Sequence, residues 1–281
     1  MIALREMLRR GGELLRDVSE APELEALVLL EESTSLSRTH LFAHPESSLT
    51  EERAAEFFTL IERRRRERLP LAYLTGRREF FSLQCCVTRD VFIRRPETEL
   101  LVEEGLDYLS TLPSQASPRV LDIGTGSGAI IVALRKHYTG RGLFFATDIA
   151  RESLSVARKN AIDNGVADIL FLQAPFFDAF APGQRFDLIL SNPPYIDRGG
   201  ESLLPPEVLT EPDRALFSAE RGLYHIRKIL RLAPGYLKPG GRLLMETGED
   251  QRSALEEEFG TELTFIQDLS GKTRFIRMDH R

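Results

Sequence analysis

Cysteine is scarce in this chain. The sequence has 281 residues and only two cysteines, Cys85 and Cys86, which are neighbours. A structural disulfide between adjacent cysteines is implausible, and no third cysteine offers either of them a partner. The residues after Met1 also lack the apolar segment of a signal peptide. We therefore expect a cytoplasmic protein, since a reducing compartment holds few disulfides.

Long apolar runs and an excess of positive charge are missing too. No run reaches the roughly 20 residues that a membrane span needs, so no membrane partner is expected. Lysine and arginine number 37 against 43 acidic residues, which gives a net charge of −6. That balance argues against broad contact with phosphates, and we expect no direct nucleic-acid binding. His40 and His44 have no further ligand clustered with them, so no metal site is predicted. Nothing marks an assembly surface, which leaves a monomer as the expectation.

The chain divides into three predicted parts. Residues 1–70 show helical spacing of apolar residues and are expected to form a small all-helical N-terminal domain. Residues 71–95 are expected to form a linking β-hairpin. From residue 96 to residue 281, strands and helices alternate, which predicts an α/β domain with a parallel sheet covered on both faces. Two last extended runs, Leu263–Ile266 and Thr273–Arg277, would bring this sheet to seven strands.

The α/β part contains a glycine-rich loop between a predicted strand and a predicted helix. The strand is Arg119–Ile123, and the loop reads Gly124, Thr125, Gly126, Ser127 and Gly128. Such a loop lets the backbone approach a ligand, with helix N–H groups facing it. About 20 residues further on, the next strand ends in Asp148, where a carboxylate accepts hydrogen bonds from ribose hydroxyls. The spacing is G-x-G-x-G, with Asp122 two residues before the first glycine, and differs from that of a dinucleotide site. The sulfonium cofactor S-adenosylmethionine has no pyrophosphate to bind at the helix, but its cationic amino group suits a nearby carboxylate such as that of Asp122.

The second motif is Asn192-Pro193-Pro194-Tyr195, directly after the apolar run 186–191. Prolines cannot donate to a strand ladder and they stiffen the backbone, so the strand must end there in a rigid loop. This loop presents an amide side chain, unpaired carbonyl oxygens and an aromatic ring. The Asn192 oxygen and the Pro193 carbonyl would accept the two N–H bonds of a planar NH2 group. Tyr195 would pack its ring against the amide plane and shape the pocket, and all four residues, Pro194 included, are predicted to bind the substrate.

Together with these motifs, three further segments resemble the protein-glutamine N-methyltransferases that modify peptide chain release factors (the PrmC/HemK family). The segments are Arg77–Leu83, Arg95–Glu99 and Asp268–Arg274. They are similar to the family's R-E-F-aromatic-x-L, R-P-E-T-E and D-L-x-G-x-x-R patterns. They follow in the family's order, and the resemblance covers nearly the whole chain.

The resemblance implies a class I methyltransferase with a Rossmann-like sheet and S-adenosylmethionine as cofactor. The enzyme would methylate the glutamine side-chain amide in the Gly-Gly-Gln loop of release factors, its protein partners in translation termination, and the helical domain would recognise this substrate. Asn192, Pro193 and Tyr195 are then the catalytic residues. The predicted cofactor-binding residues are Gly124, Thr125, Gly126, Ser127, Gly128, Asp148, Phe176 and Asn192.

Two positions depart from the family's pattern. Pro175 stands where the family commonly has an acid that receives the adenine amino group, beside Phe176, which can stack on adenine or line its pocket. Arg94 stands where the family usually has proline, directly before Arg95. We expect a change in loop stiffness there without loss of activity.

Other functions share these motifs. An adenine N6-methyltransferase acting on nucleic acid would use Asn-Pro-Pro-Tyr equally well on a flipped-out base, although the acidic balance speaks against it. A glutamine methyltransferase of a ribosomal protein has the same chemistry, but Arg95–Glu99 and Asp268–Arg274 favour the release-factor branch. A non-catalytic nucleotide-binding module would leave Asn192–Tyr195 unexplained. The run Arg63–Arg66 is expected to be a solvated helix end, with a docking patch for an acidic release factor or RNA as the alternative.

Overall fold

The computed structural model describes residues 2–268 and 270–280, so Leu269 of the Asp268–Arg274 segment lies outside the described residues. The chain divides into two compact units. The first comprises Met1–Arg77 and Pro205–Thr210, and the second comprises Arg78–Leu204 and Glu211–Arg281.

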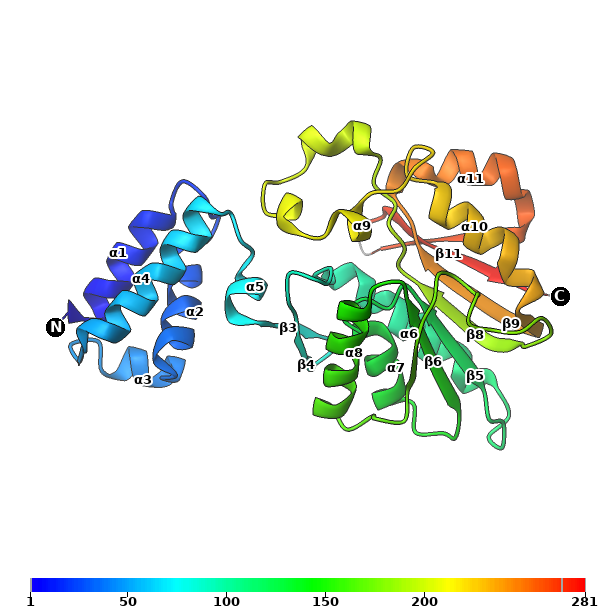
Figure 1. Ribbon diagram of the computed structural model, residues 1–281, viewed down its shortest axis with the longest axis horizontal. Helices are drawn as coiled ribbons and strands as arrows, with labels where there is room; N and C mark the ends of the chain where they lie inside the picture. The colour runs from blue at the N-terminus through cyan, green and yellow to red at the C-terminus, as the bar shows by residue number, and fades with distance from the viewer. Residues whose placement is uncertain (1, 269, 281) are drawn as a thin grey trace. The chain divides into compact units, whose positions relative to one another are not determined.

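The first unit is helical (Figure 1). Its helices are α1 (Leu4–Leu15), α2 (Pro22–Thr34), α3 (Arg38–Ala43), α4 (Glu51–Arg66) and α5 (Leu71–Thr75). Two short strands, β1 (Ile2–Ala3) and β2 (Ser48–Leu49), pair antiparallel. The helices enclose fully buried apolar side chains such as Met7, Leu30 and Phe57. The helical N-terminal domain is thus confirmed, because apolar residues at helical spacing form its core.

Arg64 is buried inside this helical unit, with a side chain only 6% exposed. Its Nε donates to Glu25 at 2.7 Å and its Nη1 donates to Glu207 at 2.9 Å. A buried guanidinium needs such partners to offset the loss of water. The prediction of a solvated helix end is therefore wrong for Arg64, although Arg65 and Arg66 are exposed.

The predicted hairpin forms from β3 (Arg77–Phe80) and β4 (Leu83–Cys86). Residues 71–75 before it are helical instead of extended. The carbonyl oxygen of Pro70 accepts the backbone N–H of Tyr73 at 3.0 Å and so begins this helix. A single helical turn is too short to show a period of apolar residues, so the sequence pattern does not reveal it.

The second unit is built on a seven-stranded sheet with the order β10-β11-β9-β8-β5-β6-β7. The strands are β5 (Arg119–Ile123), β6 (Leu143–Asp148), β7 (Leu170–Gln173), β8 (Phe186–Ser191), β9 (Leu237–Glu246), β10 (Leu263–Gln267) and β11 (Thr273–Asp279). Strands β5 to β9 pair in parallel, whereas β11 lies antiparallel between β9 and β10. The predicted seven-stranded Rossmann-like sheet is confirmed, with two antiparallel strands at one edge.

Helices cover both faces of this sheet (Figure 1). One face carries α6 (Glu99–Thr111), α7 (Ala129–His137) and α8 (Arg151–Asp163), and the other carries α10 (Tyr224–Leu232) and α11 (Arg252–Phe259). The remaining helices are short: α9 (Asp213–Leu216), η1 (Pro96–Thr98), η2 (Arg198–Leu203), η3 (Val208–Thr210), η4 (Ala233–Gly235), η5 (Glu249–Gln251) and η6 (Gly260–Glu262).

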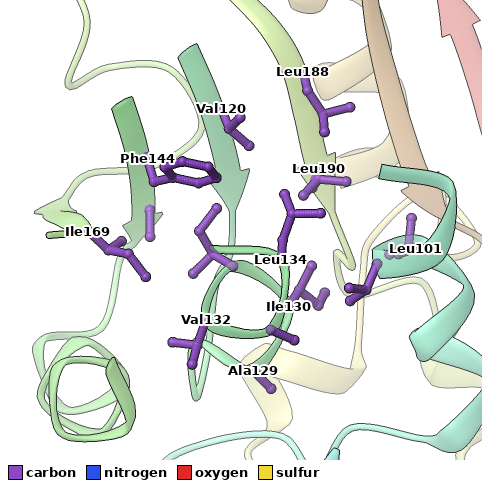
Figure 2. Packing of buried hydrophobic residues seen from close by; sticks show 14 of the residues in the cluster. Leu101, Val120, Ala129, Ile130, Val132, Leu134, Phe144, Ile169, Leu188 and Leu190 are labelled. Atoms are coloured by element: carbon purple, nitrogen blue, oxygen red, sulfur yellow. The ribbon is translucent and has the colours of Figure 1, made fainter. Parts of the chain in front are cut away.

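Alternate residues of the central strands belong to two separate cores. Val120 and Leu188 join the first core, where α7 packs with Leu134 among others (Figure 2). Leu121 and Ile189 join the second core, beneath α10. Because both faces are buried, each central strand reads as a nearly continuous apolar run.

Candidate active site

A cavity opens at the carboxyl ends of β5, β6 and β8. In an open parallel sheet, ligands bind beyond the carboxyl ends of the strands, at the point where successive strands are added on opposite sides of the sheet. Here β6 and β8 flank β5, so the loop after β5 lies at this point. The cavity is lined by Gly124 and Gly126 after β5, by Asp148 at the end of β6 and by Asn192 after β8. The topology thus brings together the two motifs that lie far apart in the sequence.

The glycine loop turns tightly beneath this cavity. The backbone N–H groups of Gly124 and Thr125 both donate to the carbonyl of Thr147 at 2.9 Å. Gly124 and Gly126 have φ angles of +68° and +58°, a region that residues with side chains rarely adopt. A Cβ added at Gly126 would also lie 3.4 Å from Nη2 of Arg94. The conformation therefore requires glycine, and at Gly126 the space is restricted as well.

Asp148 both holds the loop and lines the cavity. Its Oδ2 accepts the N–H of Gly126 and its Oδ1 accepts the N–H of Ala150, each at 2.9 Å. A carboxylate oxygen can accept a second hydrogen bond. Asp148 therefore keeps acceptor capacity for the two ribose hydroxyls that the sequence predicts.

The other three residues of the loop do not line the cavity: they are Thr125, Ser127 and Gly128. The Thr125 hydroxyl donates to buried Asp122 at 2.6 Å, and the Ser127 carbonyl accepts from Nδ2 of Asn160 at 2.8 Å. These contacts support the loop from behind. Direct contact of the three residues with a cofactor stays a prediction.

One wall of the cavity is aromatic. Phe176 lines the cavity, and its backbone has a φ angle of +48°, in the left-handed region. The ring of His225 stacks on the ring of Phe176, with 5.8 Å between the ring centroids. Nδ1 of His225 lies 2.7 Å from the Ser218 hydroxyl. Burial lowers the pKa of His225, and the charge of Lys228 acts in the same direction. Pro175 lines the same wall with a side chain that cannot accept a hydrogen bond. Sequence reasoning missed His225, because a lone histidine on a helix carries no motif.

The amide of Asn192 is held by a buried carboxylate. Glu246, the last residue of β9, is 3% exposed and accepts from Nδ2 of Asn192 at 2.8 Å. The same carboxylate accepts from the hydroxyls of Thr98 at 2.7 Å and Tyr195 at 2.9 Å. Within the described chain, no donor reaches Oδ1 of Asn192. Asn192 therefore keeps a free acceptor at the cavity wall.

Burial raises the pKa values of both Glu246 and Tyr195. Burial raises the pKa of Glu246, while the hydrogen bonds from Thr98 and Tyr195 act in the opposite direction. Burial and the neighbouring Glu246 also raise the pKa of Tyr195, so its hydroxyl remains a donor. Pro193 and Pro194 line the cavity, but Tyr195 does not. The predicted packing of its ring against a substrate amide stays a prediction, and its hydroxyl has a structural partner that the sequence does not reveal.

Two of the segments that resemble the family, Arg95–Glu99 and Arg77–Leu83, make hydrogen bonds beside the site. Arg95 donates to Glu211 at 2.6 Å, and the other carboxylate oxygen of Glu211 accepts the N–H of Ile93 at 2.8 Å. Glu99 accepts the N–H of Phe81 from the hairpin at 2.9 Å. These contacts fix the backbone of Arg95–Glu99. This segment contains Thr98, whose hydroxyl donates to Glu246.

The residues around the cavity fit an adenosyl sulfonium cofactor. The glycine backbone offers close approach, Asp148 offers acceptors for a ribose, and Phe176 offers a ring face for a base. Arg94 adds a buried guanidinium at the loop, and its Nε has no hydrogen-bond partner among the described residues. This unpaired donor leaves hydrogen-bonding capacity beside the glycine loop.

Comparison with known proteins agrees with this fit. Residues 6–76 match the PrmC N-terminal domain family, and residues 114–273 match a methyltransferase domain family. The release factor glutamine methyltransferase of Escherichia coli (strain K12) is 40% identical and covers 86% of this chain and 84% of its own. That of Moorella thermoacetica is 41% identical and covers 91% and 87%. That of Vibrio cholerae is 36% identical and covers 99% and 91%. The chain belongs to the release factor glutamine methyltransferase family.

Membership of this family makes the protein an enzyme whose methyl donor is S-adenosylmethionine. Among solved structures, the hMettl16 catalytic domain in complex with MAT2A 3′UTR hairpin 6 has a TM-score of 0.54 at 17% identity and covers 82% of both chains. This likeness shows the methyltransferase fold alone. Across the two described ranges, no helix is long and apolar enough to cross a membrane.

Proposed function

We propose that this enzyme methylates the glutamine side-chain amide in the Gly-Gly-Gln loop of peptide chain release factors. The observation that carries the proposal is the orientation of Asn192, a residue of the cavity lining, whose Nδ2 donates to Glu246 while its Oδ1 accepts no hydrogen bond from the described residues. The names of the relatives support a release factor as the protein substrate. The proposal includes a cytoplasmic monomer that acts on protein and not on nucleic acid.

The chemistry asks for a firmly held amide. A glutamine amide is a poor nucleophile because its nitrogen lone pair is delocalised into the carbonyl. S-adenosylmethionine, when bound, supplies the methyl group as an activated sulfonium. Oδ1 of Asn192 would accept one N–H of the substrate amide, and the backbone carbonyl of Pro193 would accept the other. The two acceptors orient the nitrogen and stabilise the positive charge that develops on it. The nitrogen then releases a proton without the help of a strong base.

Glu246 acts through Asn192 and is a positioning residue in this proposal. With three donors on its carboxylate, it cannot turn away without breaking several hydrogen bonds. Asn192 is thereby held with its oxygen available before a substrate arrives. Such preorganisation removes the cost of reorienting the acceptor during the transfer.

A methyl-transfer assay with labelled S-adenosylmethionine tests the proposal. Purified release factor, the same factor with its Gly-Gly-Gln glutamine replaced by alanine, large-subunit ribosomal proteins and adenine-containing DNA are offered side by side. The modified residue is mapped by mass spectrometry. We expect label on the glutamine of the intact factor and none on the alanine variant. Label confined to a ribosomal protein or to DNA would keep the enzyme class and overturn the substrate.

A further inference from the structure

Arg94 is a buried cation on the cavity wall, and the proposed mechanism gives it no task. It is 4% exposed and lines the cavity together with Gly124 and Gly126. Its Nη2 donates to the carbonyls of Gly124 at 3.3 Å and Thr125 at 3.1 Å. Its Nε is buried without a hydrogen-bond partner in residues 2–268 and 270–280. The guanidinium therefore reaches the cofactor loop with unused hydrogen-bonding capacity.

The charges around Arg94 do not neutralise it by direct contact. Its charge lowers the pKa of the carboxyls of Asp122, Glu211 and Glu246, but none of them accepts a hydrogen bond from it within the described chain. Asp122 is fully buried, with Oδ2 bound to Thr125 and Oδ1 without a described partner. None of the three carboxyls lines the cavity. A buried guanidinium without a directly paired anion is costly, and an anionic ligand group would offset that cost.

We propose that Arg94 binds the α-carboxylate of the methionyl part of S-adenosylmethionine. That carboxylate is the only anionic group of the cofactor, because the remainder is adenosine, a sulfonium and an ammonium group. A planar guanidinium presents N–H donors in the geometry that a carboxylate accepts. The inference rests on the cofactor and not on the protein substrate proposed above. It makes Arg94 a cofactor-binding residue at a position where the family's pattern has proline, which has no donor.

A purely structural role is the competing explanation. The hydrogen bonds from Nη2 to Gly124 and Thr125 could serve only to hold the glycine loop in its turn. In that case, loss of Arg94 would weaken every ligand of the loop to the same extent. A carboxylate contact would instead weaken only ligands that carry the carboxylate. Two ligands that differ in this one group therefore separate the two roles.

Isothermal titration calorimetry with S-adenosylmethionine and its decarboxylated form makes this comparison without any methyl acceptor. We expect the wild-type enzyme to bind the decarboxylated form about 10- to 100-fold more weakly, as for loss of a hydrogen-bonded charge pair. Arg94→Met should bind S-adenosylmethionine more weakly by about the same factor and should no longer distinguish the two ligands. Because no release factor is present, a wrong protein substrate does not affect the outcome.

Arg214 provides a matched control, since it also lines the cavity but is exposed. Arg214→Met should keep the wild-type preference for the carboxylate. Arg94→Pro, which carries the residue of the family's pattern, replaces Arg94→Met if the latter does not fold, and should lose the preference in the same way. The proposal is overturned if an Arg94 variant weakens both ligands equally, if it retains the preference, or if Arg214→Met abolishes the preference.

Discussion

The two ends of the cavity differ in how their buried polar groups are satisfied. At the end formed by Asn192, the carboxylate of Glu246 receives three hydrogen bonds. At the end formed by Arg94, Nε of that residue is buried without a partner in the described chain, and so is Oδ1 of Asp122 outside the cavity lining. A group that must keep one orientation during a reaction gains from being bonded beforehand, whereas a group that binds a ligand must keep free capacity. In the proposed mechanism, the transfer end is thus assembled within the protein, whereas the cofactor end is left for a ligand to complete.

The largest effect is expected when the acceptor of Asn192 at the transfer end is removed. Asn192→Ala should lower turnover about 100- to 1,000-fold, the usual cost of losing one transition-state hydrogen bond. The cofactor dissociation constant, measured by calorimetry, should change far less than turnover, because Asn192 is one of several predicted cofactor contacts and Gly124, Gly126 and Asp148 are intact. Asn164→Ala, outside the cavity, serves as the control and should keep full turnover. Near-normal turnover in Asn192→Ala would show that the amide is not held in this way.

The buried carboxyl of Asp122 should make the free energy of unfolding depend on pH. Burial raises the pKa of Asp122 from 3.8 to about 6, and the charge of Arg94 opposes this shift. The folded state therefore keeps the proton to higher pH than the unfolded state does. The stability that this group contributes is complete below pH 3.8 and is lost as the pH rises to about 6. A shift of this size corresponds to about 3 kcal/mol.

Urea unfolding between pH 4 and pH 7 measures this contribution by comparison with Asp122→Asn. The free energy of unfolding of the wild type relative to the variant should fall by about 2 kcal/mol across the interval, since part of the total is already lost at pH 4. Asp178→Asn, at an exposed site, is the control and should follow the wild-type curve. Parallel curves for the wild type and Asp122→Asn would mean that Asp122 ionises in the folded protein as it does in the unfolded chain.

The parts of the site that sequence predicts are those built from neighbouring residues. A strand, a glycine turn and a helix follow one another at 119–137, and Asp148 ends the next strand, so local backbone rules suffice. Asn192 and the prolines likewise follow their strand directly. The sheet order then brings these two loops together, which the alternation of strands and helices predicts in outline.

The supporting groups were not predictable in the same way. Glu246 lies 54 residues from Asn192 and 51 from Tyr195, and it becomes their partner only because β9 pairs with β8. From the sequence, Arg94 in place of proline predicts only a change in loop stiffness. The structure shows that its side chain donates to carbonyl oxygens of the glycine loop. Such contacts depend on tertiary packing, and their residues show no spacing that a local pattern could detect.

Glu246→Gln sharpens the comparison by keeping the shape of the transfer end while removing its charge. A glutamine has one acceptor oxygen and an NH2 group, so it cannot receive all three donors. If its oxygen takes the place of Oε2, which accepts from Thr98 and Asn192, its NH2 faces the Tyr195 hydroxyl, and the negative charge is lost in either orientation. We expect kcat to fall about 10- to 100-fold with little change in cofactor affinity. Exposed Glu257→Gln is the control. The loss should not add to that of Asn192→Ala in the double variant, because Glu246 acts through Asn192; full additivity would rule out the positioning role.

The smallest expected effect comes from Tyr195, and it separates two roles for that side chain. Tyr195→Phe keeps the ring and removes one donor to Glu246, while Thr98 and Asn192 still hold the carboxylate. Loss of one such hydrogen bond should lower kcat by about 3- to 10-fold. If the ring alone matters, by packing against the substrate amide, Tyr195→Phe should keep full turnover and Tyr195→Leu should lose it. The ratio of the two kcat values therefore measures how far Tyr195 serves the substrate directly and how far it serves Asn192 through Glu246.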